Sequence, residues 1–128
     1  MNTAEKVVAA LKGSRDERNV LIRDRNRIVC TAVLGSPKLT DAEVEQIAAM
    51  KNVSDDVLRT IGSNREWLKR YNVVLALVKN PRTPVGLSLG MVSRLNPRDM
   101  KSLTGDRNVS EVIRKQAQKF IKGPGGKS

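Results

Sequence analysis

The stretch RNRIVCTAVLGSPKLT, residues 25–40, recurs in altered form as KRYNVVLALVKNPRTP, residues 69–84. The two copies align without gaps at an offset of 44 residues, the difference between 69 and 25. Each copy holds an apolar segment of helical length followed by a turn that contains proline. The sequence therefore predicts an internal repeat in which a helix and a turn occur twice. The matched positions are Val29 and Val73, Ala32 and Ala76, Val33 and Leu77, Leu34 and Val78, and Pro37 and Pro81.

Helix-capping residues precede short apolar segments along most of the chain. A serine or threonine followed three residues later by glutamate is a capping box, in which each side chain bonds the other residue's backbone N–H. Proline just after a capping residue also marks a start, because the first helical residue needs no intrahelical donor. With Gly13 ending a first helix over residues 3–12, these signals predict about eight or nine short helices. Capping boxes occur at Ser14 and Glu17, Thr40 and Glu43, and Ser63 and Glu66, and the other predicted starts are Ser54, Thr83-Pro84, Asn96-Pro97 and Ser110.

Nothing in the chain favours β-structure. Aromatic residues make up 2% of the 128 residues, and strand-forming residues never alternate over a long stretch. Helices this short are unstable alone and must bury their apolar stripes against neighbouring helices. We therefore predict an all-α fold, a degenerate α-solenoid-like helical repeat in a single domain over residues 1–122. The Gly- and Pro-rich residues 123–128 are predicted to form a flexible tail.

Residues 73–84, and more weakly residues 28–40, resemble the leucine-rich-repeat variant motif. That motif has an apolar helix containing alanine, an Asn-Pro-x-Thr-Pro turn and a second helix, and residues 80–84 read NPRTP. The resemblance covers about residues 24–95 and implies a right-handed stack of short helices, akin to HEAT repeats. It implies an architecture and no particular activity. Some proteins of this class also carry a cysteine-rich iron–sulfur module, which a chain with one cysteine cannot supply.

Composition removes several classes of function. The chain has no histidine, which excludes Ser-His-Asp catalysis and histidine-containing zinc sites, and its single cysteine cannot form an internal disulfide. No phosphate-binding glycine loop occurs, and we predict neither a cofactor nor a metal. No apolar run is long enough to span a bilayer, and the N-terminal segment lacks the features of a secretion signal. These observations favour a non-enzymatic protein of the reducing cytoplasm.

The chain is strongly basic. It contains 24 Lys and Arg against 13 Asp and Glu, a net charge of +11. The acids concentrate in residues 41–56, so the basic character belongs to the rest of the chain. Such a surface attracts an acidic protein, a nucleic acid or an anionic lipid, and charge alone does not choose among these partners.

One candidate binding cluster lies in residues 65–71. Trp67 and Tyr71 are four residues apart and share a helical face, with cationic neighbours on either side. Aromatic side chains edged by cations can stack on bases or anchor a protein interface. For Trp67, burial between helices is the favoured alternative, because tryptophan is highly buried on average. The cluster is Arg65, Trp67, Lys69, Arg70 and Tyr71.

A second candidate cluster is Arg23, Arg25 and Arg27, which surround a predicted helix start. Guanidinium groups in this arrangement can clamp a phosphate or a carboxylate. The favoured alternative is a solvated helix face whose charge is partly neutralised by nearby acids. Two further interpretations concern packing: Cys30 is predicted to be a buried small apolar residue, and the Gly86 and Gly90 spacing predicts a close helix approach.

These observations predict a helical-repeat binding or adaptor protein whose basic surface engages an acidic protein partner. The alternative is direct DNA or RNA binding through the same basic surface, which net charge and the aromatic pair also favour. Enzymatic chemistry would have to rest on carboxylates, lysines or tyrosine alone, and no constellation of them points to a reaction.

Overall fold

The computed structural model describes residues 1–122, and this range is all helical, with ten α-helices, one 3₁₀ helix and no β-strand. The all-α prediction is confirmed. The predicted tail over residues 123–128 lies outside the described residues. The helices are α1 (Thr3–Lys12), α2 (Arg15–Leu21), α3 (Arg27–Leu34), α4 (Asp41–Ala48), α5 (Asp55–Gly62), α6 (Arg65–Leu68), α7 (Tyr71–Lys79), α8 (Val85–Met91), η1 (Val92–Arg94), α9 (Pro97–Thr104) and α10 (Glu111–Lys122).

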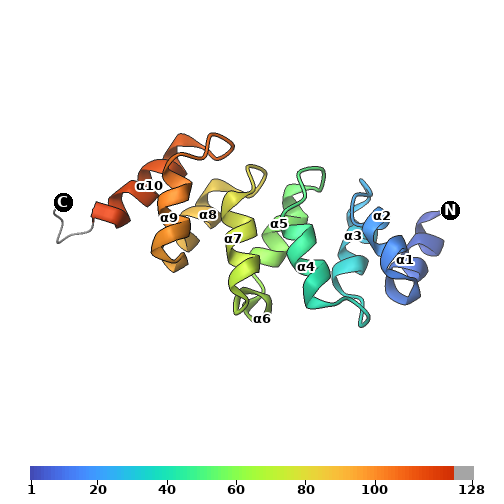
Figure 1. The fold of residues 1–128 in the computed structure, drawn as a ribbon. Coiled ribbons are helices and arrows are strands. Elements are labelled where there is room, and N and C mark those ends of the chain that lie inside the picture. Colours follow the sequence, from blue (N-terminus) through green and yellow to red (C-terminus); the bar gives the residue numbers. More distant parts are fainter. Residues whose placement is uncertain (123–128) are drawn as a thin grey trace.

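The helices follow one another along an elongated row, with α1 and α2 at one end and α10 at the other (Figure 1). Packing partners are close in the chain: α1 packs on α2 and α3, α4 on α7, and α9 on α10. Each helix therefore buries its apolar stripe mainly against helices of its own part of the row.

Most helix starts use the caps that the sequence predicts. The Ser14 hydroxyl accepts from the Glu17 N–H at 3.2 Å, and the Glu17 carboxylate accepts from the Ser14 N–H at 2.9 Å. Thr40 and Glu43 form the same reciprocal pair at the start of α4. Because these bonds satisfy backbone donors left free in the first turn, each box holds a short helix to a defined first residue.

Two predicted starts are shifted by one residue. Asn64, not Ser63, caps α6, and its side-chain oxygen accepts from the Trp67 N–H at 3.0 Å. The Ser63 hydroxyl instead donates to the carbonyl of Arg59 at 2.8 Å, closing the end of α5. Pro84 is the cap residue of α8 rather than its first helical residue.

Three of the glycines have roles that differ from those the sequence predicts. A Cβ added at Gly86 or Gly90 would meet nothing within 4 Å, so the predicted close helix approach there is wrong. Gly13 ends α1 as expected, but its φ of −79° is not left-handed. A side chain at this position would collide with the Ala9 carbonyl and the Glu17 carboxylate. Gly13 is therefore required by space rather than by backbone conformation.

One apolar core runs along the row. The matched repeat positions Val29, Val33, Val73 and Leu77 are all fully buried. Cys30 is buried beside them, which confirms its predicted packing role, and burial raises the pKa of its thiol. Within residues 1–122, no helix combines the length and the apolar character needed to cross a bilayer.

Candidate functional site

The two repeated turns each close the end of an earlier helix. The hydroxyl of Ser36 donates to the carbonyl of Leu11 at 3.1 Å, near the end of α1. Asn80, the matched residue 44 positions later, donates from its amide to the carbonyls of Ala48 at 2.8 Å and Met50 at 2.7 Å, at the end of α4. The last carbonyls of a helix have no intrahelical partner, so both side chains provide the missing donor.

The matched residues two positions further on repeat the pattern. The backbone N–H of Lys38 donates to the Ser36 hydroxyl at 3.2 Å, and that of Arg82 donates to the Asn80 side-chain oxygen at 2.9 Å. The Lys38 side chain then reaches the carbonyl of Lys12 at 2.9 Å. These turns have a structural role, because each ties a helix to an element that precedes it in the chain.

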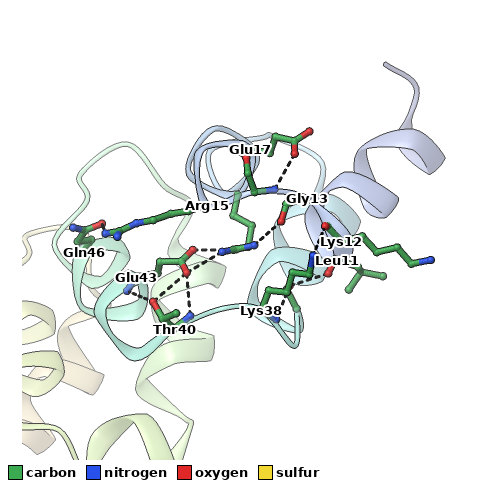
Figure 2. A network of polar contacts seen from close by, with 12 residues as sticks. Leu11, Lys12, Gly13, Arg15, Glu17, Lys38, Thr40, Glu43 and Gln46 are labelled. Atoms are coloured by element: carbon green, nitrogen blue, oxygen red, sulfur yellow. Dashed lines mark hydrogen bonds and ion pairs between the residues drawn. The ribbon is translucent and has the colours of Figure 1, made fainter.

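A buried ion pair joins α2 to α4. The guanidinium of Arg18 donates twice to the Glu43 carboxylate, at 2.8 and 3.0 Å, and once to the Gly13 carbonyl at 2.8 Å. Glu43 also closes the capping box with Thr40 (Figure 2). The hydrogen bonds from Arg18 hold the pKa of Glu43 below its usual range. Every charged atom here has a protein partner, so the network has a structural role and leaves no group free for a ligand.

A groove of about 450 Å³ lies between α4, α7 and the turn at residues 106–108. Leu75 and Ala76 of α7, both half-buried, contribute an apolar strip, and the exposed Asn72 lies one turn before them. The remaining lining residues are Glu45, Ala49, Lys51, Lys79, Asn80, Asp106 and Asn108. We call this feature the α4–α7 groove.

The charges of the α4–α7 groove are unequally paired. The Glu45 carboxylate accepts from the guanidinium of Arg70 at 2.7 and 3.0 Å, and Asp106 accepts from the Asn108 N–H at 2.9 Å. Lys51 and Lys79 are exposed and form no ion pair with any residue in the range 1–122. The groove thus offers two lysines to an incoming anion. Of its two lining acids, Glu45 is paired with Arg70, whereas Asp106 keeps its negative charge without an ion pair to any described residue.

In the predicted cluster at residues 65–71, Tyr71 is committed to packing. Its hydroxyl donates to the Asp99 carboxylate at 2.7 Å and accepts from the Asn96 N–H at 3.0 Å. Burial, with the Asp99 contact, raises its pKa. The ring therefore ties α7 to the start of α9 and cannot act as a free stacking platform beside Trp67, which is half-buried against the core.

The cations of this cluster are mostly paired as well. Arg70 binds Glu45 and also lies 3.5 Å from Asp41, and Lys69 pairs with Glu66 at 3.1 Å. Arg65 is exposed and pairs with no acid of the described chain. The Lys69–Glu66 pair is exposed and therefore weak, so Lys69 as well as the unpaired Arg65 is accessible to a partner.

The arginines around the start of α3 are exposed. Arg27 lies 3.8 Å from Asp56, whereas Arg23 and Arg25 pair with no acid in residues 1–122. Asp24, which could have neutralised them, binds Lys6 at 2.7 Å, and this bond lowers its pKa. No ion pair or side-chain hydrogen bond within residues 1–122 joins these arginines to the cluster at residues 65–71.

The residues that sequence reasoning missed are those of the α4–α7 groove, above all Lys51, Asn72 and Lys79. A signal for them existed, because residues 73–78 read VVLALV and are apolar on every side. A short surface helix normally buries a single apolar stripe. Leu75 and Ala76 are apolar residues outside that stripe, and their presence indicates a second, partly covered apolar surface on the helix.

Residues 1–122 contain no cluster of three or more potential metal-ligating side chains among His, Cys, Asp and Glu. No protein-family model, no curated protein and no solved structure matches the chain.

Proposed function

We propose that this chain is a non-enzymatic helical-repeat binding protein that holds an acidic polypeptide in the α4–α7 groove. The observation that carries the proposal is the presence of two unpaired lysines, Lys51 and Lys79, beside an apolar strip in a hollow of about 450 Å³. The proposal keeps the acidic partner expected from net charge, but its binding site is the groove next to residues 65–71 and not that cluster itself.

The proposed architecture is a degenerate α-solenoid. Ser36 and Asn80, which occupy matched positions in the two similar segments, support it. Each side chain donates a hydrogen bond to a carbonyl near the end of an earlier helix. The local pairing of helices along the row supports it too. Stacked helical units present an extended face suited to polypeptides. The right-handed twist and the likeness to leucine-rich-repeat variants remain predictions.

The chemistry of the groove suits an extended acidic segment. Carboxylates of the partner would pair with Lys51 and Lys79, and its apolar side chains would cover Leu75 and Ala76. The amide of Asn72 carries both a donor and an acceptor, so it can bond a partner's backbone N–H and C=O together. Partner contacts of this kind favour an extended backbone with alternating acidic and apolar side chains.

The test is fluorescence anisotropy with a labelled peptide of alternating glutamate and leucine. We expect Lys51→Glu with Lys79→Glu to weaken binding at least about tenfold, because attraction becomes repulsion. Lys12→Glu with Lys115→Glu is the matched control: it makes the same change in net charge outside the groove and should bind within about twofold of the unaltered protein. Equal loss in both pairs, or no binding by the unaltered protein, would reject the proposal.

A second candidate function is nucleic-acid binding at Arg23, Arg25 and Arg27. It is favoured by the exposure of these arginines and by the engagement of Asp24 with Lys6. Titration with a short duplex and a single strand at two salt concentrations tests it, since phosphate contacts give a steep salt dependence. Replacing the three arginines with glutamine should abolish that binding and leave the acidic peptide's affinity unchanged.

A further inference from the structure

The end of α10 carries apolar side chains that its neighbours do not cover. Ile113 and Ala117 are buried against the core, but Phe120 and Ile121, which continue the same stripe, are 42% and 48% exposed. The reason is length, because α10 has 12 residues and its partner α9 has 8. Apolar area left open in this way favours association.

These side chains border a hollow of about 380 Å³, which we call the α10 hollow. Its other lining residues are Leu95, Pro97, Met100 and Lys101. Lys101, Lys119 and Lys122 are exposed and form no ion pair within residues 1–122. The α10 hollow is thus an apolar depression lined by one cation, Lys101, and Lys119 and Lys122 are the chain neighbours of its lining residues Phe120 and Ile121.

The opposite end of the row has the complementary character. Val20 of α2 is 65% exposed and borders a hollow of about 280 Å³, the α2 patch, together with Met1, Asp16, Glu17 and Leu21. Asp16 pairs with no cation among the described residues. Arg18 is buried in its pair with Glu43, so the charged groups that line the α2 patch are the Asp16 and Glu17 carboxylates and the Met1 ammonium, which together leave one net negative charge.

We propose that the α2 patch of one copy docks into the α10 hollow of a second copy, so that the chain assembles head to tail. Three properties support this occupant: both surfaces are apolar, the net charges of their lining residues are opposite in sign, and α2 and α10 lie at opposite ends of the row (Figure 1). Two different surfaces meet in such a contact, so each bound copy still offers one free end. Further copies can therefore add beyond the dimer, and growth stops only if the assembly closes into a ring.

The test is sedimentation velocity of the full chain over about a hundredfold range of concentration. We expect the sedimentation coefficient to rise with concentration past the dimer value, and to fall when salt is raised from about 0.05 M to about 0.5 M. A monomer at every concentration would overturn the proposal.

Two blocking variants make the test specific. Val20→Lys places a cation on the α2 patch, opposite Lys101 of the α10 hollow, and Ile121→Gln places an uncharged polar group in the apolar lining of that hollow. Each variant alone should be monomeric, because every copy lacks the same half of the contact. An equimolar mixture should form a one-to-one dimer and nothing larger, since each variant retains the half that the other lacks.

The outcomes separate the possible occupants. Assembly of either variant alone would show that one surface pairs with itself, and a mixture that stays monomeric would show that neither surface binds the other; both results overturn the proposal. Val112→Gln is the matched control, because Val112 is 51% exposed on α10 and does not line the hollow. It should assemble like the unaltered protein. All variants change exposed residues, and thermal melting followed by circular dichroism confirms that they fold. The result is independent of peptide binding in the α4–α7 groove.

Discussion

Glu43 shows how one residue can serve two structural roles. It completes the capping box of α4 and neutralises Arg18, whose side chain, like its own, is 6% exposed. The capping box is readable from sequence because its spacing is local. The ion pair is not, since Arg18 is 25 residues away and is one of several similar arginines in its segment. A local pattern thus identified the residue but not its most consequential contact.

We expect Glu43→Met to lower the free energy of unfolding by about 3–5 kcal/mol, because it leaves Arg18 buried without a counter-charge. Urea unfolding followed by circular dichroism measures this loss. The double variant Arg18→Met with Glu43→Met should be more stable than the single variant, since it removes the unpaired charge. A double variant less stable than the single one would contradict this account of the pair.

The same pair predicts the acid sensitivity of the fold. Arg18 lowers the pKa of Glu43 in the folded state from its ordinary value of 4.5, so ionised Glu43 favours folding above that pH. This contribution is lost as the pH falls from 4.5 through the lower folded-state pKa. Unfolding free energies measured across that acid range should fall more steeply for the unaltered protein than for Arg18→Met with Glu43→Met. Parallel pH profiles would exclude Glu43 as the source.

At the scale of elements, Asn80 connects one turn to the end of another helix. Asn80→Asp keeps the shape but replaces the donor amide with a carboxylate facing the carbonyls of Ala48 and Met50. We expect it to cost at least about 1–3 kcal/mol of unfolding free energy, because two carbonyls lose their donor and meet an anion. Asn80→Ser, which copies the residue at the matched position Ser36, should cost less. Thermal or urea unfolding of the two variants decides the order, and equal losses would argue against the donor role.

At the scale of the whole molecule, the proposed solenoid predicts that instability stays local. Ile113→Ala opens a cavity under α10 and should cost about 2–5 kcal/mol in that part of the chain. Because stacked units contact only their neighbours, native-state hydrogen exchange should show reduced protection in α9 and α10, with α1 and α3 unchanged. A uniform loss of protection along the chain would indicate one globular cooperative unit instead.

The sequence by itself determined the helical class, most helix ends and the buried apolar positions that match between residues 25–40 and 69–84, because capping, periodicity and proline placement act over three to five residues. Tertiary structure decided which cations are free. The sequence predicts Tyr71 and Arg70 as binding residues. In the structure Tyr71 is hydrogen-bonded to Asp99, 28 residues away, and Arg70 to Glu45, 25 residues away. Lys51 and Lys79 carried no special pattern, and they became candidates because two helices placed them at one groove. Charge pairing and concavity depend on which distant elements meet, and a local pattern does not contain that information.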